Sequence, residues 1–313
     1  MHNKIFTKQK KIILILCDKG KIGTLRQCEA LAKPLANHFD AELIYIDVNL
    51  PFWFKVLTPR LTRHWPIALL PTNIKKQPSL IIAAGRQAFL LASPVAKHIP
   101  TIALLNPRCP LNYFKVIIPP QHDGIGEHTN VIETLGSLHP HNSASFTTKP
   151  FKDHNIITVL LGGNSKHYTF QEKDFIEIST YLKEKAASKS HTKILISPSR
   201  RTPMFGVDIL RRELAHIDST IWDNTGENPY FSYIGAANEI LVTSDSISMI
   251  SEACYLGKPV EIWQLPICNK RFDRFYKAII KAQHAVFARK KWPEKFKPLK
   301  ELDRILPILI KKI

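Results

Sequence analysis

Residues 242–252, with the sequence VTSDSISMISE, carry side chains suited to recognising a phosphate and a ribose. An apolar strand runs directly into a helix, and the free N–H groups and dipole at a helix start attract phosphate. Glu252, one to two turns along, is placed to accept hydrogen bonds from ribose hydroxyls. An ordinary Ser/Asp helix cap explains the same pattern. The candidate ligand-binding residues in this segment are Ser244, Asp245, Ser246, Ser248 and Glu252.

Two other predicted strand ends carry residues of phosphate-binding types. In the run GGNS at residues 162–165, paired glycines let backbone N–H groups approach a diphosphate, although a plain turn has the same composition. In the run SPSRRTP, adjacent arginines between prolines do not fit a smooth helix face, and one of them could clamp a phosphate. A solvated basic loop is the alternative for this run. The candidates are Gly162, Gly163, Asn164, Ser165, Ser199, Arg200 and Arg201.

The loop after the predicted strand at residues 219–223 could hold a nucleotide base by stacking and backbone hydrogen bonds. Trp222 supplies the ring, although a tryptophan at such a place is more often part of the core. The candidate residues of this loop are Trp222, Asn228, Pro229 and Tyr230.

A proton acceptor is expected in the first half of the chain. His122 beside Asp123 ends a predicted strand and titrates in the useful range, although an arbitrary histidine is more often a surface loop residue. Asp18 opens the glycine loop DKGKIGTLRQ, which resembles a G-x-x-G phosphate loop but is neither a Walker motif nor G-x-G-x-x-G. Gly85-Arg86 and Asn106-Pro107-Arg108 mark two further strand ends.

These residues require a scaffold of strands that alternate with helices. Continuous apolar runs predict strands, and segments of helical periodicity lie between them, which indicates parallel sheets covered on both faces. Beyond residue 270 the pattern predicts basic helices rather than strands. The predicted strands are 10–16, 41–47, 78–85, 101–106, 114–120, 156–163, 192–199, 219–223, 239–246 and 258–263, and the predicted helices are 24–38, 86–97, 171–189, 207–216, 230–237 and 248–256.

The length of 313 residues suggests two domains. Residues 136–155 lose apolar periodicity and are rich in Ser, Thr, His and Pro, which predicts a linker. We therefore expect one doubly wound domain over 1–148 and a second over 149–313. With 44% apolar and 22% charged residues, the composition excludes a disordered chain, a collagen and a disulfide-dense scaffold.

The charge predicts an anionic neighbour. The chain has 44 Lys and Arg against 26 Asp and Glu, a formal net charge of +18, and the excess is concentrated in residues 1–150 and 269–313. Aromatic and basic residues between 50 and 65 suggest contact with an anionic membrane, although a packed helix with a solvated face fits equally well. The candidate membrane contacts are Phe52, Trp53, Phe54, Lys55, Arg60 and Arg63. Nucleic acid is the least favoured partner, because no nucleic-acid-binding signature is present.

Five widely spaced cysteines with no C-x-x-C pair fit neither a disulfide framework nor a zinc site, and they indicate a reducing compartment. No stretch approaches the ~18–20 apolar residues of a membrane span. We therefore expect a cytoplasmic protein that is peripheral to the inner face of the cytoplasmic membrane.

Together the motifs resemble one known family, the Elm-type mitochondrial-fission family of GT-B-like glycosyltransferases, and in particular its bacterial members. The resemblance covers nearly the whole chain. The motifs that carry it are DKGKIGTLRQCEALA, LIIAAGR, NPR, PPQHDGIGEHTNVIETLGSLH, LLGGNSKHYTF, SPSRRTP, GENPYFSYIGAANEILVTSDSISMISEACYLGKPV and KRFDRFY.

The resemblance implies a GT-B-like α/β fold, with two Rossmann-like domains facing a cleft and C-terminal helices (about 270–313) that cross back to the N-terminal domain. SDSISMISEACYLGKP is similar to the donor-site segment of MurG-like transferases. That similarity implies diphosphate contacts from Ser246 and Ser248 and a ribose contact from Glu252. It also implies donor-phosphate roles for the second-domain residues Gly163, Asn164 and Arg200 and, from the first domain, for Gly23 and Thr24.

The preferred hypothesis is sugar transfer from a nucleotide diphosphate sugar to a lipid-linked or cell-envelope acceptor, with no cofactor and no metal. Helix starts and Arg200 would stabilise the leaving diphosphate, and His122, Asp123 or Asp18 would take the acceptor proton. The alternatives are a non-catalytic membrane-associated fission or recruitment protein on the same fold, or a nucleotide-sugar epimerase.

Overall fold

The structure is a computed structural model that describes residues 10–64, 77–141, 143–146, 154–267 and 269–313. It divides into two compact units. Unit 1 comprises the described residues up to Thr134, with Leu138–Pro140 and Glu301–Ile313, and unit 2 comprises Leu135–Ser137 and the described residues of His141–Lys300. The boundary therefore lies earlier than the expected 148. Of the C-terminal segment 270–313, only the last 13 residues join unit 1.

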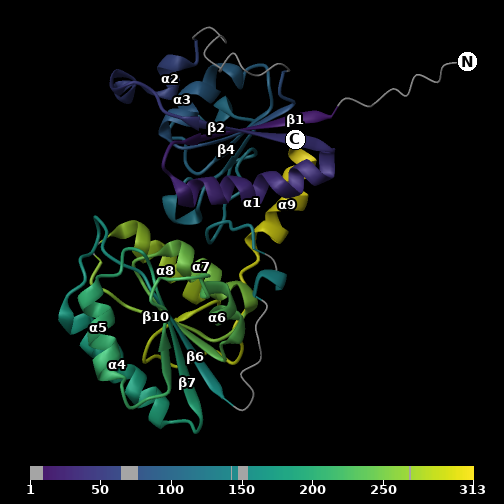
Figure 1. Cartoon of the computed structure of the whole chain (residues 1–313). Coiled ribbons are helices and arrows are strands. Elements are labelled where there is room, and N and C mark those ends of the chain that lie inside the picture. Colours follow the sequence, from purple (N-terminus) through teal and green to yellow (C-terminus); the bar gives the residue numbers. More distant parts are fainter. Residues whose placement is uncertain (1–9, 65–76, 142, 147–153, 268) are drawn as a thin grey trace, which may run out of the picture. The chain divides into compact units, whose positions relative to one another are not determined.

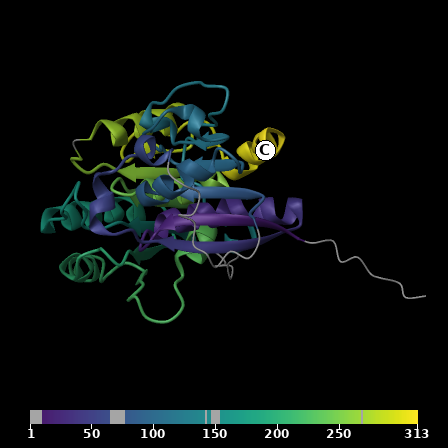
Figure 2. The same cartoon turned by 90° about the horizontal axis from the view of Figure 1, so that it is seen from above.

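Unit 1 is built on a parallel five-stranded sheet in the order β2-β1-β3-β4-β5. Its strands are β1 (Lys11–Asp18), β2 (Ala41–Val48), β3 (Leu80–Ala84), β4 (Thr101–Leu104) and β5 (Val116–Ile118). The run KIILILCD of β1 is almost wholly buried because the sheet is covered on both faces. Figure 2 gives the view from above, in which the paired β1 and β2 run side by side.

Two layers of helices cover this sheet (Figure 1). Helices α1 (Ile22–Phe39) and α9 (Glu301–Lys312) pack on one face, against Ile13 and Ile15. Helix α3 (Arg86–Val95) packs on the other face, against Leu14 and Leu16. The remaining short helices are η1 (Phe52–Val56), α2 (Pro59–Thr62), η3 (Leu111–Tyr113) and η4 (Gln121–Asp123).

Unit 2 is built on a parallel six-stranded sheet in the order β11-β10-β9-β6-β7-β8. Helices α4 and α5 pack on one face, and α6, α7 and α8 pack on the other. The strands are β6 (Asn155–Leu161), β7 (Thr192–Pro198), β8 (Ser219–Ile221), β9 (Glu239–Thr243), β10 (Val260–Trp263) and β11 (Val286–Phe287). The helices are η5 (Ser143–Phe146), α4 (Glu172–Ala187), α5 (Met204–Glu213), α6 (Tyr230–Ala236), α7 (Ile247–Ala253), η6 (Cys254–Leu256) and α8 (Lys270–Lys281).

One secondary-structure prediction is wrong. The segment after residue 270 was expected to contain helices only, but Val286–Phe287 forms the short edge strand β11 beside β10. A two-residue strand has no periodicity of its own, so its pairing is set by the sheet edge that it meets. No helix within the described ranges has the length and apolar character needed to cross a bilayer.

Each sheet has a topological switch point, where the chain reverses its direction of travel across the strands. In unit 1 the point lies between β1 and β3, and in unit 2 it lies between β6 and β9. Ligands of open α/β sheets bind beyond the carboxyl ends of the strands at such a point. The fold therefore places the run GGNS after β6 next to the run SDSIS after β9.

Candidate functional site

Asp245, just beyond the end of β9, lies at the switch point of the unit 2 sheet. Its side chain is fully buried; it accepts a hydrogen bond from the N–H of Gly163 (2.9 Å) and one from the hydroxyl of Thr243 (2.7 Å). Burial raises the pKa of the Asp245 carboxyl, although these hydrogen bonds and Arg201 act in the opposite direction. Asp245 therefore joins the loop after β6 to the loop after β9, rather than facing a ligand.

The two glycines after β6 are required by close packing. A Cβ atom on Gly162 would overlap the Asp245 carboxylate, and one on Gly163 would overlap the backbone of Arg201. The paired glycines thus let three strand-end loops approach one another. A bound phosphate is not needed to explain them.

The backbone N–H groups of residues 162–165 were expected to approach a diphosphate, but in the structure they donate to protein atoms. Gly162 donates to the Thr243 hydroxyl (2.8 Å) and Gly163 to Asp245, while the N–H groups of Asn164 and Ser165 donate to the carbonyl oxygens of Arg201 (3.0 Å) and Tyr168 (2.9 Å). All four amides therefore have protein acceptors, so none is available to a diphosphate in this conformation. The side chains of Asn164 and Ser165 likewise accept hydrogen bonds within the loop.

The turn after β7 separates the roles of the two adjacent arginines. The Arg201 guanidinium donates to the carbonyl oxygen of Asn164 (3.2 Å) and lies 3.8 Å from the Asp245 carboxylate, so it braces the loops. Arg200 is exposed and makes no ion pair with the described residues. Ser199 forms the turn itself, through hydrogen bonds with Thr202 and Arg201. Both arginines are exposed, and Arg201 is the one whose guanidinium is engaged in bracing the loops.

The segment after β9 keeps some of its predicted side chains accessible and buries others. Ser246 caps α7 by accepting a hydrogen bond from the N–H of Met249, and Ser248 is exposed with its hydroxyl 3.3 Å from that of Ser137. Ser244 is fully buried: its hydroxyl accepts from the N–H of Leu265 and its carbonyl from the hydroxyl of Tyr276. The prediction that Ser244 meets a ligand is therefore wrong.

Glu252 and Tyr230 come together from separate segments. The Tyr230 hydroxyl donates to the Glu252 carboxylate (2.7 Å), and both side chains are half-buried. Asn228 and Pro229 lead into α6, where the Asn228 side chain accepts the N–H of Tyr230. The half-buried Trp222 donates from its ring N–H to the carbonyl oxygen of Thr225 within the same loop. The structure thus brings Tyr230 to Glu252, which the sequence reading did not predict.

In unit 1, Asp18 performs a structural task at the other switch point. Its carboxylate accepts the N–H of Ala88 (2.8 Å) in the first turn of α3, and it occupies the space that a Cβ on Gly85 would need. Only 8% of Asp18 is exposed. The residue caps α3, so its predicted role as a proton acceptor is not supported.

The remaining predicted residues of unit 1 differ in accessibility. His122, in η4, is buried, and its neighbour Asp123 is half-buried. Gly23 and Thr24 lie in the first turn of α1, which has no side-chain cap and no acidic residue. Their predicted contact with donor phosphates stays a prediction.

Some of the proposed membrane-contact residues have exposed side chains, and others are half-buried or bonded within unit 1. Phe52 is 79% exposed and Arg60 is also exposed, whereas Phe54 is half-buried. Arg63 is half-buried and donates to the carbonyl oxygens of Ser93 (2.6 Å) and Tyr113 (3.0 Å), so its guanidinium is engaged within unit 1, and its membrane contact stays a prediction. Burial lowers the pKa of this guanidinium. The side chains of Trp53 and Lys55 lie outside the described residues.

Two threonines of the site were missed by the sequence reading. Thr243 links Gly162 to Asp245, and Thr202 links the turn after β7 to Ser199 and to Gly162. Both stand directly beside a predicted residue, but a threonine at a strand or turn boundary is too common to be distinctive. Within the described ranges, no group of three or more His, Cys, Asp or Glu side chains is arranged to hold a metal ion.

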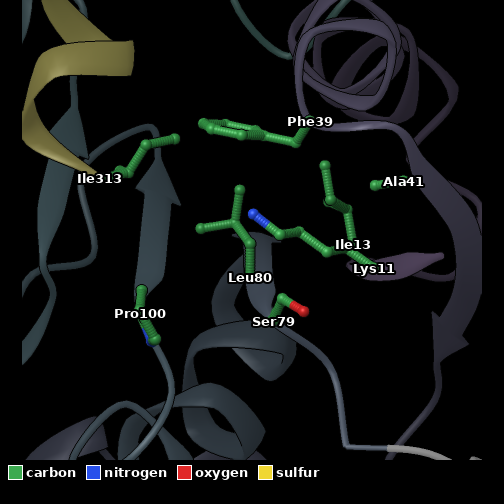
Figure 3. Close-up of a pocket in the computed structure, with 8 residues that line it drawn as sticks. All are labelled: Lys11, Ile13, Phe39, Ala41, Ser79, Leu80, Pro100 and Ile313. Atoms are coloured by element: carbon green, nitrogen blue, oxygen red, sulfur yellow. The ribbon is translucent and has the colours of Figure 1, made fainter. Parts of the chain in front are cut away.

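A small apolar pocket of about 90 Å³ lies at the opposite end of the unit 1 sheet (Figure 3). It is formed where β1, β2 and β3 begin, and the ammonium of Lys11 lies 5.3 Å from the centre of the Phe39 ring. Because ligands of such sheets bind at the carboxyl edge, this pocket is not part of the candidate site.

Known proteins resemble the chain in fold. MurG from Acinetobacter baumannii superposes with a TM-score of 0.53 at 13% identity, over 96% of this chain and 91% of that one. A UDP-GlcNAc 2-epimerase from Neisseria meningitidis, solved with UDP-GlcNAc bound, gives a TM-score of 0.54 at 12% identity, over 96% and 90%. The chain thus has the GT-B-like fold of glycosyltransferases and epimerases, as predicted.

The sequence comparisons show the family. An uncharacterised protein of Rickettsia prowazekii, RP120, is 30% identical over 307 residues, covering 82% of this chain and 84% of that protein. The mitochondrial fission protein ELM1 of Arabidopsis thaliana is 24% identical over 243 residues, covering 66% of this chain but only 56% of that protein. The family described as mitochondrial fission ELM1 matches residues 22–313, and the chain belongs to that family.

Proposed function

We propose that the protein transfers a sugar from a nucleotide diphosphate sugar to a membrane-associated acceptor, and that unit 2 binds the donor. The observation that carries this proposal is the carboxyl edge at β6 and β9. There Arg200 is exposed on the turn after β7, next to Arg201, which braces the loop after β6. The Tyr230 hydroxyl at the start of α6 donates a hydrogen bond to Glu252 in α7, the helix that follows β9. This is where open α/β sheets bind ligands.

In this proposal each side chain has a separate task. Arg200 meets the diphosphate through its planar guanidinium and stabilises the charge that develops as the diphosphate leaves. Glu252, oriented by the Tyr230 hydroxyl, accepts hydrogen bonds from the ribose. Ser246 and Ser248 supply hydroxyl groups at the start of α7, on the segment after β9. The task of Asp245 is to position these loops, because its carboxylate is already fully engaged.

The proton acceptor is Asp123 in this proposal. His122 and Asp18 are both buried, and Asp18 is held by the N–H of Ala88, whereas Asp123 keeps a partly accessible side chain. No cofactor is invoked, because the charge on the leaving diphosphate can be met by Arg200.

A nucleotide-sugar epimerase is the second candidate, since the fold is equally similar to an epimerase that binds UDP-GlcNAc and to MurG. Both candidates require a nucleotide sugar in unit 2. They differ in product: transfer releases the nucleoside diphosphate, whereas epimerisation returns a nucleotide sugar. The third candidate, a non-catalytic fission or recruitment protein, requires neither product.

The test is a thermal-shift screen of the purified protein against sugars of UDP, GDP, CDP and dTDP at about 1 mM, since a bound ligand raises the melting temperature. We expect one nucleotide to stabilise the protein. No shift with any of them would refute donor binding and would leave the non-catalytic reading. Chromatography of the product with the stabilising sugar then separates transfer from epimerisation.

Glu252→Ala should weaken binding of that nucleotide by about tenfold or more, since a hydrogen bond to a charged group contributes ~1.5–3 kcal/mol. Tyr230→Phe keeps the carboxylate and should have a smaller effect. Glu177→Ala, which alters an exposed glutamate of α4, is the matched control. Unchanged affinity in Glu252→Ala would refute the ribose assignment.

A further inference from the structure

A cavity of about 480 Å³ lies at the carboxyl edge of the unit 1 sheet. Its walls include Gly85 and Arg86, which follow β3, and residues 105–108, which follow β4. Because β3 and β4 are neighbours in the sheet, the two strand ends GR and NPR meet in one place. The size is within the ~300–1,000 Å³ of small-molecule sites. These two motifs have no task in the proposed donor site.

One side of the cavity is cationic. Arg86 and Arg108 both line it, both are exposed, and no residue of its lining is acidic. The nearby Asp18 carboxylate is engaged by the N–H of Ala88. The lining thus contains two guanidinium groups, the side-chain type that binds phosphate through planar N–H donors.

The loop that presents Arg108 is held in an unusual conformation. Leu105 and Arg108 both have positive φ angles, 76° and 54°, in the left-handed region that side chains other than glycine rarely adopt. The Asn106 side chain accepts a hydrogen bond from the N–H of Arg108 (2.9 Å). This hydrogen bond holds the backbone of Arg108 in place beside the cavity.

The other side of the cavity is apolar and continues onto the surface. Leu57, Phe89 and Leu105 line it, and Leu57 directly follows the exposed end of η1. Val56 and Phe52 of that helix are 78% and 79% exposed, and Leu61 of α2 is 57% exposed. Exposed apolar side chains therefore adjoin Leu57 along the chain, and a free phosphate would have no contact to make with them.

We infer that this cavity binds a phosphorylated aliphatic compound, with its phosphate on Arg86 and Arg108 and its chain along Leu57 towards η1. In the proposed transferase such a compound is the acceptor, and this reading rests on the proposed function. The binding itself does not: the cavity is in unit 1, and it is tested without any nucleotide sugar. Its failure would leave the donor proposal untouched.

The experiment is isothermal titration of the full chain with n-octyl phosphate, n-octanol and inorganic phosphate in low-salt buffer. We expect octyl phosphate to bind at least tenfold more tightly than either of the other two. Equal affinity for inorganic phosphate would overturn the apolar part of the site, and equal affinity for octanol would overturn the phosphate part.

Variants assign the binding to this cavity. Arg108→Gln should weaken octyl phosphate at least tenfold, and Leu57→Ser should weaken octyl phosphate while leaving inorganic phosphate unchanged. Arg26→Gln, the same substitution on the exposed face of α1, should bind as the unsubstituted protein does. Arg108 and Leu57 line the cavity at its surface and leave the buried core intact, and circular dichroism checks the fold. Wild-type affinity in both cavity variants would refute the site.

Discussion

Asp245 shows how one buried carboxylate can determine the shape of a site without touching its ligand. It receives hydrogen bonds from Gly163 and Thr243 and fills the space that a larger residue at Gly162 would need. Burial raises its pKa above the ordinary value of 3.8. A carboxyl group whose pKa is raised in the folded state stabilises the fold at low pH and loses that contribution as the pH rises through the folded pKa.

Replacing Asp245 with Asn should therefore reduce the pH dependence of stability above about pH 4. The amide cannot ionise, yet it keeps an oxygen for the N–H of Gly163. In the unsubstituted protein, ionisation of Asp245 lowers the free energy of unfolding as the pH rises from about 4 to about 7. We expect this contribution to be absent in Asp245→Asn, so that stability at about pH 7, relative to that at about pH 4, is higher than in the unsubstituted protein. Urea unfolding at a series of pH values measures it.

Asp208→Asn provides the comparison, because Asp208 is exposed on α5 and forms an ion pair with the exposed Arg211. It should leave the pH profile almost unchanged. If Asp245→Asn shows the same profile as the unsubstituted protein, the Asp245 carboxyl does not titrate in the folded state as described.

At the scale of elements, α6 is held in place by a lysine from a different segment. The Lys258 ammonium donates to the carbonyl oxygens of Ile234, Gly235 and Ala237, which end this seven-residue helix. Because Tyr230 begins the same helix, Lys258 fixes the element that brings Tyr230 to Glu252. A helix this short has little stability of its own.

Lys258→Met should lower the free energy of unfolding by about 2–3 kcal/mol, since it leaves three carbonyl groups without their charged donor. It should also weaken nucleotide binding through the loss of Tyr230 alignment. Chemical denaturation and the thermal-shift assay give the two readouts.

Lys277→Met on α8 removes an exposed ion pair with Asp273 and should change stability far less. Equal effects of the two substitutions would show that Lys258 acts as a surface charge rather than as a cap.

The order of elements was predictable because continuous apolar strands and periodic helices leave strong local patterns. The run KIILILCD at β1 and the strand–helix pattern of residues 239–253 are examples. The identity of hydrogen-bond partners was not predictable. Glycines at 162 and 163 fit a phosphate loop and a tight junction of loops equally well, and only the positions of Thr243 and Asp245 decide between them.

The boundary between the units was also hard to predict. The predicted linker of residues 136–155 contains η5, whose Phe146 stacks on Tyr255 with ring centres 5.2 Å apart. The polar composition of this stretch conceals the aromatic contact that Phe146 makes. Similarly, Arg63 stands among aromatic and basic residues in the sequence, but its contacts with Ser93 and Tyr113 come from distant segments.

At the scale of the whole molecule, the net charge of +18 is carried partly by one face of a helix. The buried side of α8 consists of Phe272, Phe275, Tyr276 and Ile279, and its exposed side bears Lys270, Arg271, Arg274, Lys277 and Lys281. In unit 1, exposed Phe52, Val56 and Leu61 add apolar side chains near Arg60. Such surfaces suit anionic lipid headgroups.

We therefore expect the protein to bind vesicles that contain an anionic phospholipid and to be released as salt is raised, because exposed charges are screened within about 10 Å at 0.1 M. Vesicle flotation measures the bound fraction, with purely zwitterionic vesicles as the control. The double substitution Phe52→Asp and Val56→Asp should reduce the vesicle-bound fraction below that of the unsubstituted protein at the same salt concentration. Failure to bind anionic vesicles even at low salt would exclude the membrane proposal.

The order of the loop after β6 affects the conformational entropy of ligand binding. Its four amides are already bonded to Thr243, Asp245, Arg201 and Tyr168, so it has adopted its shape before any ligand arrives. A ligand that docks on it need not supply the free energy of ordering it. In deuterated solvent these amide hydrogens should exchange slowly in the protein without ligand, and nucleotide should change their rates little. The backbone of this loop is therefore preorganised, and side chains around it must provide the contacts with a ligand.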